Sequence, residues 1–190
     1  MSPKNLMRRL PRAFYEEADC EQVAQRLLGK FLVHERGNKK YVGRIVETEA
    51  YLGPHDLAAH SSKGVTARTQ VMFGAAGHAY VYLIYGIHHC MNVVTGPLGS
   101  GSAVLIRAVE PIEGIELPTH GPGRLCKAME IDRRHNGLDV CDGPLYIADA
   151  PEVAVASIVK TTRVGVDYAG VWAQKLLRFY EKDNAFVSKK

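Results

Sequence analysis

The sequence contains no apolar run close to the ~20 residues that a membrane-spanning helix needs. Residues 1–14 carry basic side chains but lack the apolar stretch of a signal peptide. The four cysteines are far apart and include no CxxC pair, which excludes a short-spaced disulfide framework and favours reduced thiols. We therefore expect a cytoplasmic protein that has no membrane partner.

Motifs for metals and phosphates are missing as well. His88, His89 and Cys90 are adjacent, but neighbouring residues of a strand point to opposite faces and do not readily share one ion. No HxxxH, HExxH or paired CxxC motif supplies further ligands, and neither the zinc-deaminase pattern nor a GxxxxGKS/T loop occurs. We expect no metal and no cofactor, and keep a metal-dependent hydrolase built on these three residues as an alternative.

No internal repeat, low-complexity tract or linker divides the chain, so we expect one domain over residues 1–190. Hydrophobic residues make up 46% of the sequence and charged residues 23%, which is ordinary for a soluble globular domain with a sizeable core. Lys and Arg number 24 against 20 Asp and Glu, giving a net charge of +4. This excess is compatible with a polyanionic partner but does not establish one.

Helical and strand-like patterns predict a mixed α/β domain. Asp19 followed by Gln22 is typical of a helix N-terminus, and Gly29 of the end of that helix. Pro122 favours the start of a second helix. Residues 52–77 form a loop of a length that usually serves a function. Strand-like sequence covers residues 31–35, 41–51, 78–86, 88–96, 102–111, 145–147 and 163–166, and residues 188–190 are expected to be loose.

The segment from Gly43 to Tyr51, GRIVETEAY, places two carboxylates in an otherwise apolar strand pattern. Strand alternation puts Glu47, Glu49 and Tyr51 on one face. A single glutamate on a strand is most often simply exposed, so the segment alone does not define a site. A carboxylate beside an aromatic ring nevertheless suggests a functional site.

Three further features are candidates for function. Arg107 interrupts the apolar strand at residues 102–111, where an arginine needs a partner or a ligand. Tyr80 and Tyr82 share one strand face, on which they either pack in the core or stack on a planar ligand. Tyr85 falls at the turn of a predicted hairpin, and because turns rarely bury rings it is the stronger functional candidate.

Several blocks spread over nearly the whole chain point to one family. The resemblance rests on GRIVETEAYLGP, the AAHS around His60, VMFG, GHAYVYLIYGIHHCMNVVTG, AVLIRAVEP and GPGRLC, and extends from RAFYEE to TTRVGVD and KLLRFY. In order and spacing these blocks closely resemble the alkyladenine, or 3-methyladenine, DNA glycosylases of the mammalian-type class, which has bacterial members. The resemblance implies an α+β domain with a curved, largely antiparallel sheet flanked by helices and a protruding β-hairpin.

The resemblance also implies an activity and a partner. The partner is double-stranded DNA that contains damaged purines, and the enzyme is a monomer without metal or cofactor. Its reaction is hydrolysis of the N-glycosidic bond of a purine flipped out of the duplex, initiating base-excision repair. Cationic 3-methyladenine and 7-methylguanine leave without protonation, whereas neutral hypoxanthine and ethenoadenine need help for the leaving group.

Individual residues take roles from the same resemblance. Glu49 matches the general base and Arg107 the arginine that holds this carboxylate. Tyr85 matches the residue that fills the gap left in the DNA stack. The residues around the flipped base are Tyr51, His60 and Tyr82, which sandwich it, Tyr80 beside them, Asn92, which crowds a guanine 2-amino group, and Leu105 on the same wall.

The chain departs from many relatives in the loop at residues 62–76. It has Ser62, Ala67, Thr69, Gln70 and Ala76 where basic residues, asparagine and proline are common, which weakens the expected contact with the DNA backbone but not the reaction. A non-catalytic nucleic-acid or damage-binding module on the same fold is the alternative function. The remaining candidates for phosphate contacts are Lys63, Arg68, Arg124 and Lys127.

Overall fold

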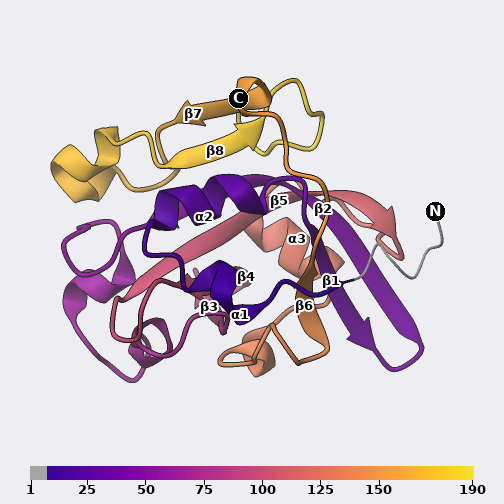
Figure 1. Cartoon of the computed structure of the whole chain (residues 1–190), viewed down its shortest axis with the longest axis horizontal. Coiled ribbons are helices and arrows are strands. Elements are labelled where there is room, and N and C mark those ends of the chain that lie inside the picture. The colour runs from indigo at the N-terminus through magenta and orange to yellow at the C-terminus, as the bar shows by residue number, and fades with distance from the viewer. Residues whose placement is uncertain (1–7) are drawn as a thin grey trace.

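A computed structural model describes residues 8–190, and residues 1–7, the first part of the amino-terminal segment considered above, lie outside it. Within the described residues the strands form one curved antiparallel sheet in the order β3-β4-β5-β2-β1-β6, with β8 on β2 and β7 on β8 (Figure 1). This architecture confirms the predicted mixed α/β fold. The strands are β1 (Phe31–Arg36), β2 (Lys39–Tyr51), β3 (Ala79–Ile84), β4 (His88–Thr95), β5 (Ser102–Glu113), β6 (Leu145–Ala148), β7 (Ile158–Thr161) and β8 (Arg178–Glu181).

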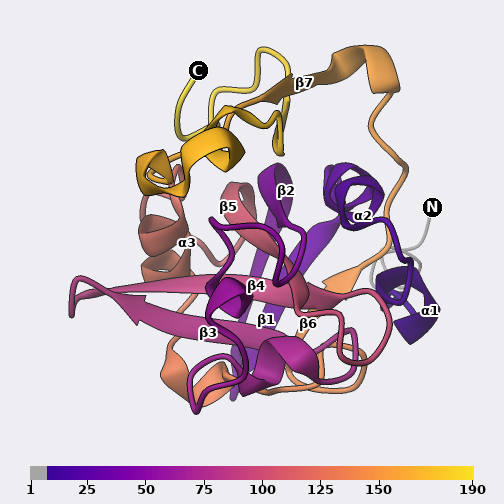
Figure 2. The same cartoon turned by 90° about the vertical axis from the view of Figure 1, so that its left-hand side faces the viewer.

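Short helices cover the sheet, and α2 and α3 lie on either side of β2 and β5 (Figure 2). The side chain of Asp19 accepts hydrogen bonds from the backbone N–H groups of Glu21 and Gln22, so α2 begins where the sequence predicts. Pro122 is the first residue of α3, which also begins where the sequence predicts. The α-helices are α1 (Arg12–Tyr15), α2 (Cys20–Leu27) and α3 (Pro122–Ala128), and the 3-10 helices are η2 (His60–Lys63), η3 (Gln70–Phe73), η4 (Arg133–His135), η5 (Val155–Ser157) and η6 (Asp167–Gln174).

Strand β2 is the centre of the sheet. One edge pairs with β5, while the other pairs with β1 along its first half and with β8 at residues 47–49. The register between β2 and β5 passes from Ile45–Val109 to Glu47–Ala108 and then to Thr48–Ile106, so Val46 and Arg107 have no direct partner. Such bulges bend a strand and redirect side chains. Arg107 therefore sits at an irregularity of an otherwise regular strand pair.

Strands β3 and β4 form the predicted hairpin, whose turn, Tyr85–Ile87, protrudes at the left of Figure 2. Tyr85 has a positive φ of 53°, which lies in the left-handed region that residues other than glycine rarely adopt. Its side chain is 86% exposed. A strained backbone that presents an exposed ring at a turn is unusual and is compatible with a functional role.

Two predictions about the C-terminal part of the sequence are wrong. Residues 163–166 are not a strand; the strand β7 ends at Thr161, and the following residues turn inward toward β2. The segment 188–190 is not loose, because the backbone N–H of Ser188 donates to the buried Glu47 and the carbonyl of Lys189 accepts from Arg178. Neither hydrogen bond joins residues that are close together in the sequence, so no local sequence pattern predicts them.

The core lies between the sheet and the helices and is apolar, with residues such as Leu27, Ile45, Ile106 and Leu125 fully buried in one cluster. No helix in the described part of the chain is long and apolar enough to cross a membrane.

Candidate active site

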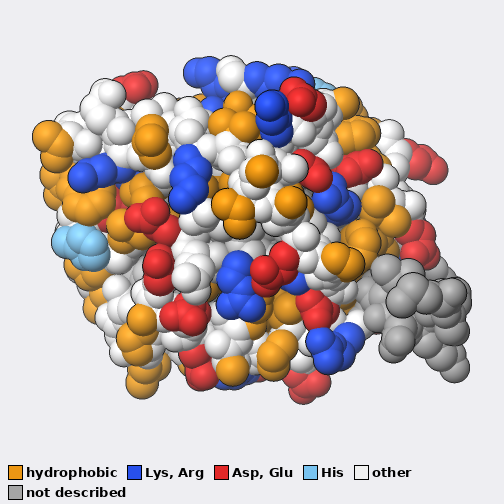
Figure 3. All heavy atoms as spheres, turned by 45° about the horizontal axis from the view of Figure 1, so that its top comes forward, with side chains coloured by type: hydrophobic (Ala, Val, Ile, Leu, Met, Phe, Trp, Pro, Cys, Tyr) orange, Lys and Arg blue, Asp and Glu red, His pale blue; other side chains and the backbone are white. Residues whose placement is uncertain are grey.

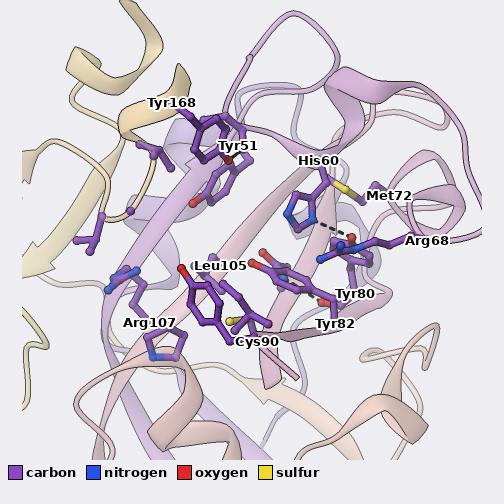
Figure 4. A pocket seen from close by; sticks show the side chains of 18 residues that line it. Tyr51, His60, Arg68, Met72, Tyr80, Tyr82, Cys90, Leu105, Arg107 and Tyr168 are labelled. Carbon is purple, nitrogen blue, oxygen red and sulfur yellow. Dashed lines mark hydrogen bonds between the residues drawn. The ribbon is translucent and has the colours of Figure 1, made fainter. Parts of the chain in front are cut away.

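One pocket gathers most of the residues that the sequence singles out. Its cavity volume is about 360 Å³. Figure 4 shows Tyr51 and Tyr168 on one side of the pocket and His60 with Tyr82 on another. The candidate residues that line it are Tyr51, His60, Tyr80, Tyr82, Tyr85, Asn92, Leu105 and Arg107.

Glu49 lies directly behind the wall of this pocket, and its side chain is fully buried. The hydroxyl of Tyr51 donates to Oε2 over 2.8 Å, and the backbone N–H of Val164 donates to Oε1 over 2.8 Å. Arg107 Nη1 is 3.3 Å from Oε1. All three groups that hold the carboxylate belong to residues that line the cavity. Glu49 and Tyr51 thus share a face, as strand alternation predicts.

Arg107 is almost completely buried and contacts both glutamates of β2. Its Nε donates to Glu47 Oε1 over 3.1 Å while Nη1 faces Glu49. The bulge in β5 places this side chain between the two carboxylates. These contacts supply the partner that an arginine in an apolar strand requires. Glu47 is correspondingly not a solvated side chain; it is as buried as Glu49.

A second buried ion pair supports the same wall. Arg163 Nη1 lies 2.5 Å from Asp56 Oδ2 and Nη2 lies 2.8 Å from Oδ1, and both side chains are fully buried. The Arg163 guanidinium also lies over the ring of Tyr51, 4.7 Å from its centre. Since Val164 follows directly, this ion pair fixes both the ring and the N–H group that contact Glu49.

The opposite wall is aromatic. The rings of Tyr80 and Tyr82 are 5.4 Å apart, and His60 meets Tyr82 edge to face at 4.6 Å. His60 Nδ1 is also hydrogen-bonded to the Tyr80 hydroxyl at 3.0 Å. His60 and Tyr82 are thus already in contact with each other, so the space for a planar ligand lies between them and Tyr51 (Figure 4).

Burial lowers the pKa of His60 to about 4, with a smaller contribution from the nearby Arg68. Burial also raises the pKa of Tyr80 and Tyr82. At neutral pH this wall therefore consists of uncharged rings. One cation lies against it, because the guanidinium of Arg68 sits over the ring of Tyr82, 5.1 Å from its centre.

Asn92 and Leu105 face each other across β4 and β5. The side-chain amide of Asn92 donates to the carbonyl of Tyr80 over 3.0 Å, which fixes its orientation at the pocket wall. Both side chains are buried and both line the cavity.

The three adjacent residues of the metal hypothesis are separated in the structure. Cys90 is buried and lines the pocket, whereas His88 is exposed and packs beside Gly123. Among residues 8–190, no group of three or more His, Cys, Asp or Glu side chains is arranged to hold a metal ion.

Some lining residues had no role in the sequence interpretation. Part of the pocket wall is formed by Val164, Gly165 and Val166, between β7 and η6, and by Tyr168 of η6. Val164, Gly165 and Val166 belong to the TTRVGVD block, which carried the family resemblance without an assigned position in the site, and Tyr168 follows this block directly. Arg163 lies in the same block, but its pairing with the buried Asp56 had no signal, since nothing local identifies partners so far apart in sequence.

Comparisons with known proteins identify the family of this chain. A family model described as methylpurine-DNA glycosylase matches residues 13–185. A relative from Legionella pneumophila (strain Corby) is 58% identical over 183 residues, which covers 96% of this chain and 100% of the relative. One from Myxococcus xanthus (strain DK1622) is 53% identical over 182 residues, covering 95% and 93% respectively. Both relatives are named, provisionally, as 3-methyladenine DNA glycosylases. This chain therefore belongs to the methylpurine-DNA glycosylase family and is a hydrolase that acts on N-glycosyl bonds.

Proposed function

We propose that the protein is a monofunctional DNA glycosylase that excises alkylated purines from duplex DNA with a water molecule activated by Glu49. The observation that carries this proposal is the buried Glu49 carboxylate, held by Tyr51, Arg107 and Val164 directly behind an aromatic pocket. The pocket is of a size and shape suited to one planar base, and DNA bases in a duplex reach such a pocket only by flipping.

The arrangement of donors around Glu49 suits a base for hydrolysis. Water that attacks the anomeric carbon must lose a proton as positive charge develops on the sugar, and a nearby carboxylate accepts that proton and stabilises that charge. Oε1 of Glu49 already contacts both Val164 and Arg107, whereas Oε2 accepts only from Tyr51 and has capacity for one more hydrogen bond. We propose that a bound nucleotide completes the water site at the wall formed by Tyr51, Arg107 and Val164, since catalytic contacts often tighten only in the complex.

The aromatic wall supports selection of cationic bases. Purines such as 3-methyladenine and 7-methylguanine carry positive charge while attached to the sugar, and electron-rich rings attract cations. The Arg68 guanidinium lies over the face of Tyr82 in the free site, so this ring accepts a cation, and a cationic base would have to displace that guanidinium. A protonated His60 would repel such a base, and its lowered pKa keeps the ring neutral at pH 7. Hypoxanthine and ethenoadenine are candidates for weaker substrates because they are neutral.

Exclusion of normal guanine is proposed for Asn92 and Leu105. The amide of Asn92 is held by the carbonyl of Tyr80 and has little freedom to move away from a guanine 2-amino group. Leu105 narrows the same wall without offering a hydrogen bond. The clash disfavours every base that carries a 2-amino group, 7-methylguanine included, and costs nothing for lesions that lack this group, such as 3-methyladenine.

The surface around the pocket supports DNA as the partner. Tyr85 projects from the hairpin with its ring exposed, as intercalation into the gap left by a flipped nucleotide requires. Within residues 8–190, the candidate phosphate contacts take part in no ion pair, which leaves them available for a polyanion. These residues are Lys63, Arg68, Arg124 and Lys127.

We further propose an abasic product with an uncut backbone, a monomeric enzyme and action in the cytoplasm on chromosomal DNA. Strand cleavage by a lyase step needs an amine nucleophile. None of the described residues that line the pocket is a lysine. Borohydride trapping of a covalent adduct with DNA would contradict this part of the proposal.

The test is release of 3-methyladenine and 7-methylguanine from methylated duplex DNA in the presence of EDTA. We expect the wild-type protein to release both, and Glu49→Gln to reduce release by about a thousandfold or more while it still binds the duplex. Undiminished release by Glu49→Gln would refute the assigned base. Binding without release by the wild type would favour the non-catalytic module, and loss of activity in EDTA would favour a metal-dependent hydrolase.

A further inference from the structure

The mechanism proposed above gives no role to the fully buried carboxylate of Glu47. Glu47 accepts four hydrogen bonds: from Arg107 Nε at 3.1 Å, from Arg178 Nη1 at 2.9 Å, and from the hydroxyl and backbone N–H of Ser188 at 3.0 and 2.7 Å. A buried charge is retained only where it is paired and hydrogen-bonded, and this one is fully satisfied. Its partners come from strand β5, strand β8 and the segment that follows β8.

Arg107 is held from three directions by this arrangement. Its Nε donates to Glu47, its Nη2 donates to the hydroxyl of Ser188 over 3.2 Å, and its Nη1 faces Glu49. A guanidinium is planar, so two fixed nitrogen atoms determine the place of the third. The position of the group that contacts Glu49 therefore follows from Glu47 and Ser188.

Arg178 connects the same cluster to the other side of Glu49. Besides Glu47, it donates from Nε to the carbonyl of Thr162 over 2.8 Å and from Nη1 to the carbonyl of Lys189 over 2.7 Å. Thr162 lies two residues before Val164, whose N–H group holds Glu49. One arginine thus links both of the segments that reach the catalytic wall.

We infer that Glu47, Arg178 and Ser188 are positioning residues for the reaction, which fix Arg107 and the Val164 segment against Glu49. This inference rests on the proposed role of Glu49 as the base. The segment at Ser188, which the sequence predicted to be loose, becomes part of the active-site support.

The charges in this cluster make the inference testable. Glu47 and Glu49 carry two negative charges, and Arg107 and Arg178 carry two positive charges, so the four side chains balance. Replacing Glu47 by Gln leaves one excess positive charge, which favours the ionised form of Glu49. Replacing Arg178 by Gln leaves one excess negative charge, which disfavours it. The two substitutions break the same ion pair and yet act on Glu49 in opposite directions.

The other groups that face Glu49 do not obscure this difference. Burial raises the pKa of Tyr51, Tyr82, Cys90 and Tyr168, so these four remain uncharged below pH 8. Asp56 and Arg163 balance each other as an ion pair. His60, whose pKa burial lowers to about 4, becomes protonated only at the acidic end of the range, and neither substitution alters its contacts. Movements of the acidic limb in opposite directions in the two variants therefore report on Glu49 and its charged neighbours.

The experiment measures single-turnover release of 7-methylguanine from duplex DNA between pH 4.5 and 8 for Glu47→Gln and Arg178→Gln. We expect both variants to bind DNA like the wild type and to lose about tenfold or more in the maximal rate. We expect the acidic limb to move to lower pH in Glu47→Gln and to higher pH in Arg178→Gln, each by about one unit. Shifts in the same direction, or none, would overturn the inference.

A matched control lies on the same two strands. Arg44 of β2 pairs with Glu181 of β8 at 2.5 and 2.8 Å, away from the pocket lining. Arg44→Gln and Glu181→Gln break an equivalent link between β2 and β8, so they report the effect of lost stability alone. We expect no movement of the acidic limb in either control.

Ser188 provides a milder variant that decides the question if a charge substitution prevents folding. Ser188→Ala removes the hydroxyl that bridges Glu47 and Arg107 but keeps the backbone N–H bond to Glu47. We expect a severalfold lower maximal rate that Ser188→Thr restores. Equal rates for both variants and the wild type would contradict the inference. Activity that survives in Glu49→Gln would instead refute the proposed base, which separates the two failures.

Discussion

The two walls of the pocket are built on different principles. The carboxylate wall, formed by Glu47, Glu49, Asp56, Arg107 and Arg163, consists of buried charges that hold one another. The hairpin wall, formed by His60, Tyr80, Tyr82 and Tyr85, consists of uncharged rings that become more exposed toward the turn. The contrast indicates that the proposed chemistry depends on buried charges held in fixed positions, whereas the proposed recognition depends on ring surfaces, of which Tyr85 is the most exposed.

Elsewhere on the surface, charged side chains are exposed and lie close to side chains of opposite charge, as is usual for a globular protein. On the face shown in Figure 3, lysine and arginine side chains lie beside acidic ones. Arg26 and Glu152 form one exposed ion pair of the protein surface. Exposed pairs of this kind contribute at most about 1 kcal/mol each, and often nothing measurable. The buried pairs of the carboxylate wall differ because neither partner can be rehydrated if the other is lost.

The sharpest test of this contrast is Arg163→Met. The substitution leaves Asp56 charged and unpaired in the interior, and we expect it to lower the free energy of unfolding by about 3–5 kcal/mol. Urea denaturation monitored by circular dichroism measures this change. Base release should fall with it, because Tyr51 and Val164 lose the group that fixes them.

The double variant Asp56→Asn with Arg163→Met is the control, since it also removes the negative charge that the single variant leaves unpaired at Asp56. We expect it to recover part of the lost stability, which a double-mutant cycle quantifies. A small loss in the single variant, comparable to that of an exposed pair, would show that the carboxylate wall is not held together by its buried charges.

On the hairpin wall the largest effect is expected from Tyr85→Ser. Loss of the ring removes stacking worth about 1–3 kcal/mol per base, so we expect binding to a lesion duplex to weaken by about 5- to 150-fold. Binding to a lesion that is already looped out should weaken less, because the ring's proposed role is to replace a lost stack. Stability should not change, since the side chain is exposed.

Tyr85→Phe keeps the ring and is the matched control, with an expected affinity close to that of the wild type. Fluorescence anisotropy with the two duplexes gives both comparisons. Equal losses on the stacked and looped-out lesions would remove the intercalating role from Tyr85 and leave it as a general contact.

The sequence anticipates the two walls to different degrees. Alternation along β2 is enough to place Glu49 and Tyr51 together, and the hairpin pattern is enough to expose Tyr85. Both depend on residues that are close in sequence, where strand geometry leaves few choices.

The residues that hold the carboxylate wall in place are not predicted by any local sequence pattern. Arg107 reaches both glutamates because bulges break the register of β2 and β5, and alternation assumes that no bulge occurs. Ser188 and Arg163 lie 141 and 107 residues away in sequence from Glu47 and Asp56, which they contact, and their segments have no regular hydrophobic periodicity. Contacts between residues so distant in sequence depend on how the whole chain packs, so they can be identified only from the three-dimensional structure.

A finer test of the hairpin wall is Tyr82→Leu, which keeps an apolar side chain but removes the ring face. Attraction between a ring and a cation is worth about 0.5–2 kcal/mol. We therefore expect release of cationic 7-methylguanine to fall about 2- to 30-fold more than release of neutral hypoxanthine. Measured kcat/KM values for both substrates give this ratio, and Tyr82→Phe should preserve it. An unchanged ratio in Tyr82→Leu would mean that shape, and not charge, selects the base.

The smallest expected effect concerns the exposed cations. Lys63 and Lys39 are both exposed lysines, but Lys39 pairs with Glu130 at 3.2 Å whereas Lys63 pairs with no acidic side chain of residues 8–190. A lysine that contacts phosphate releases a counterion on binding, so Lys63→Ala should lower the slope of log affinity against log salt concentration by about one. Lys39→Ala should leave that slope unchanged. If the two variants behave alike, the unpaired cations do not mark the path of the DNA backbone, and affinity would have to come from the hairpin wall itself.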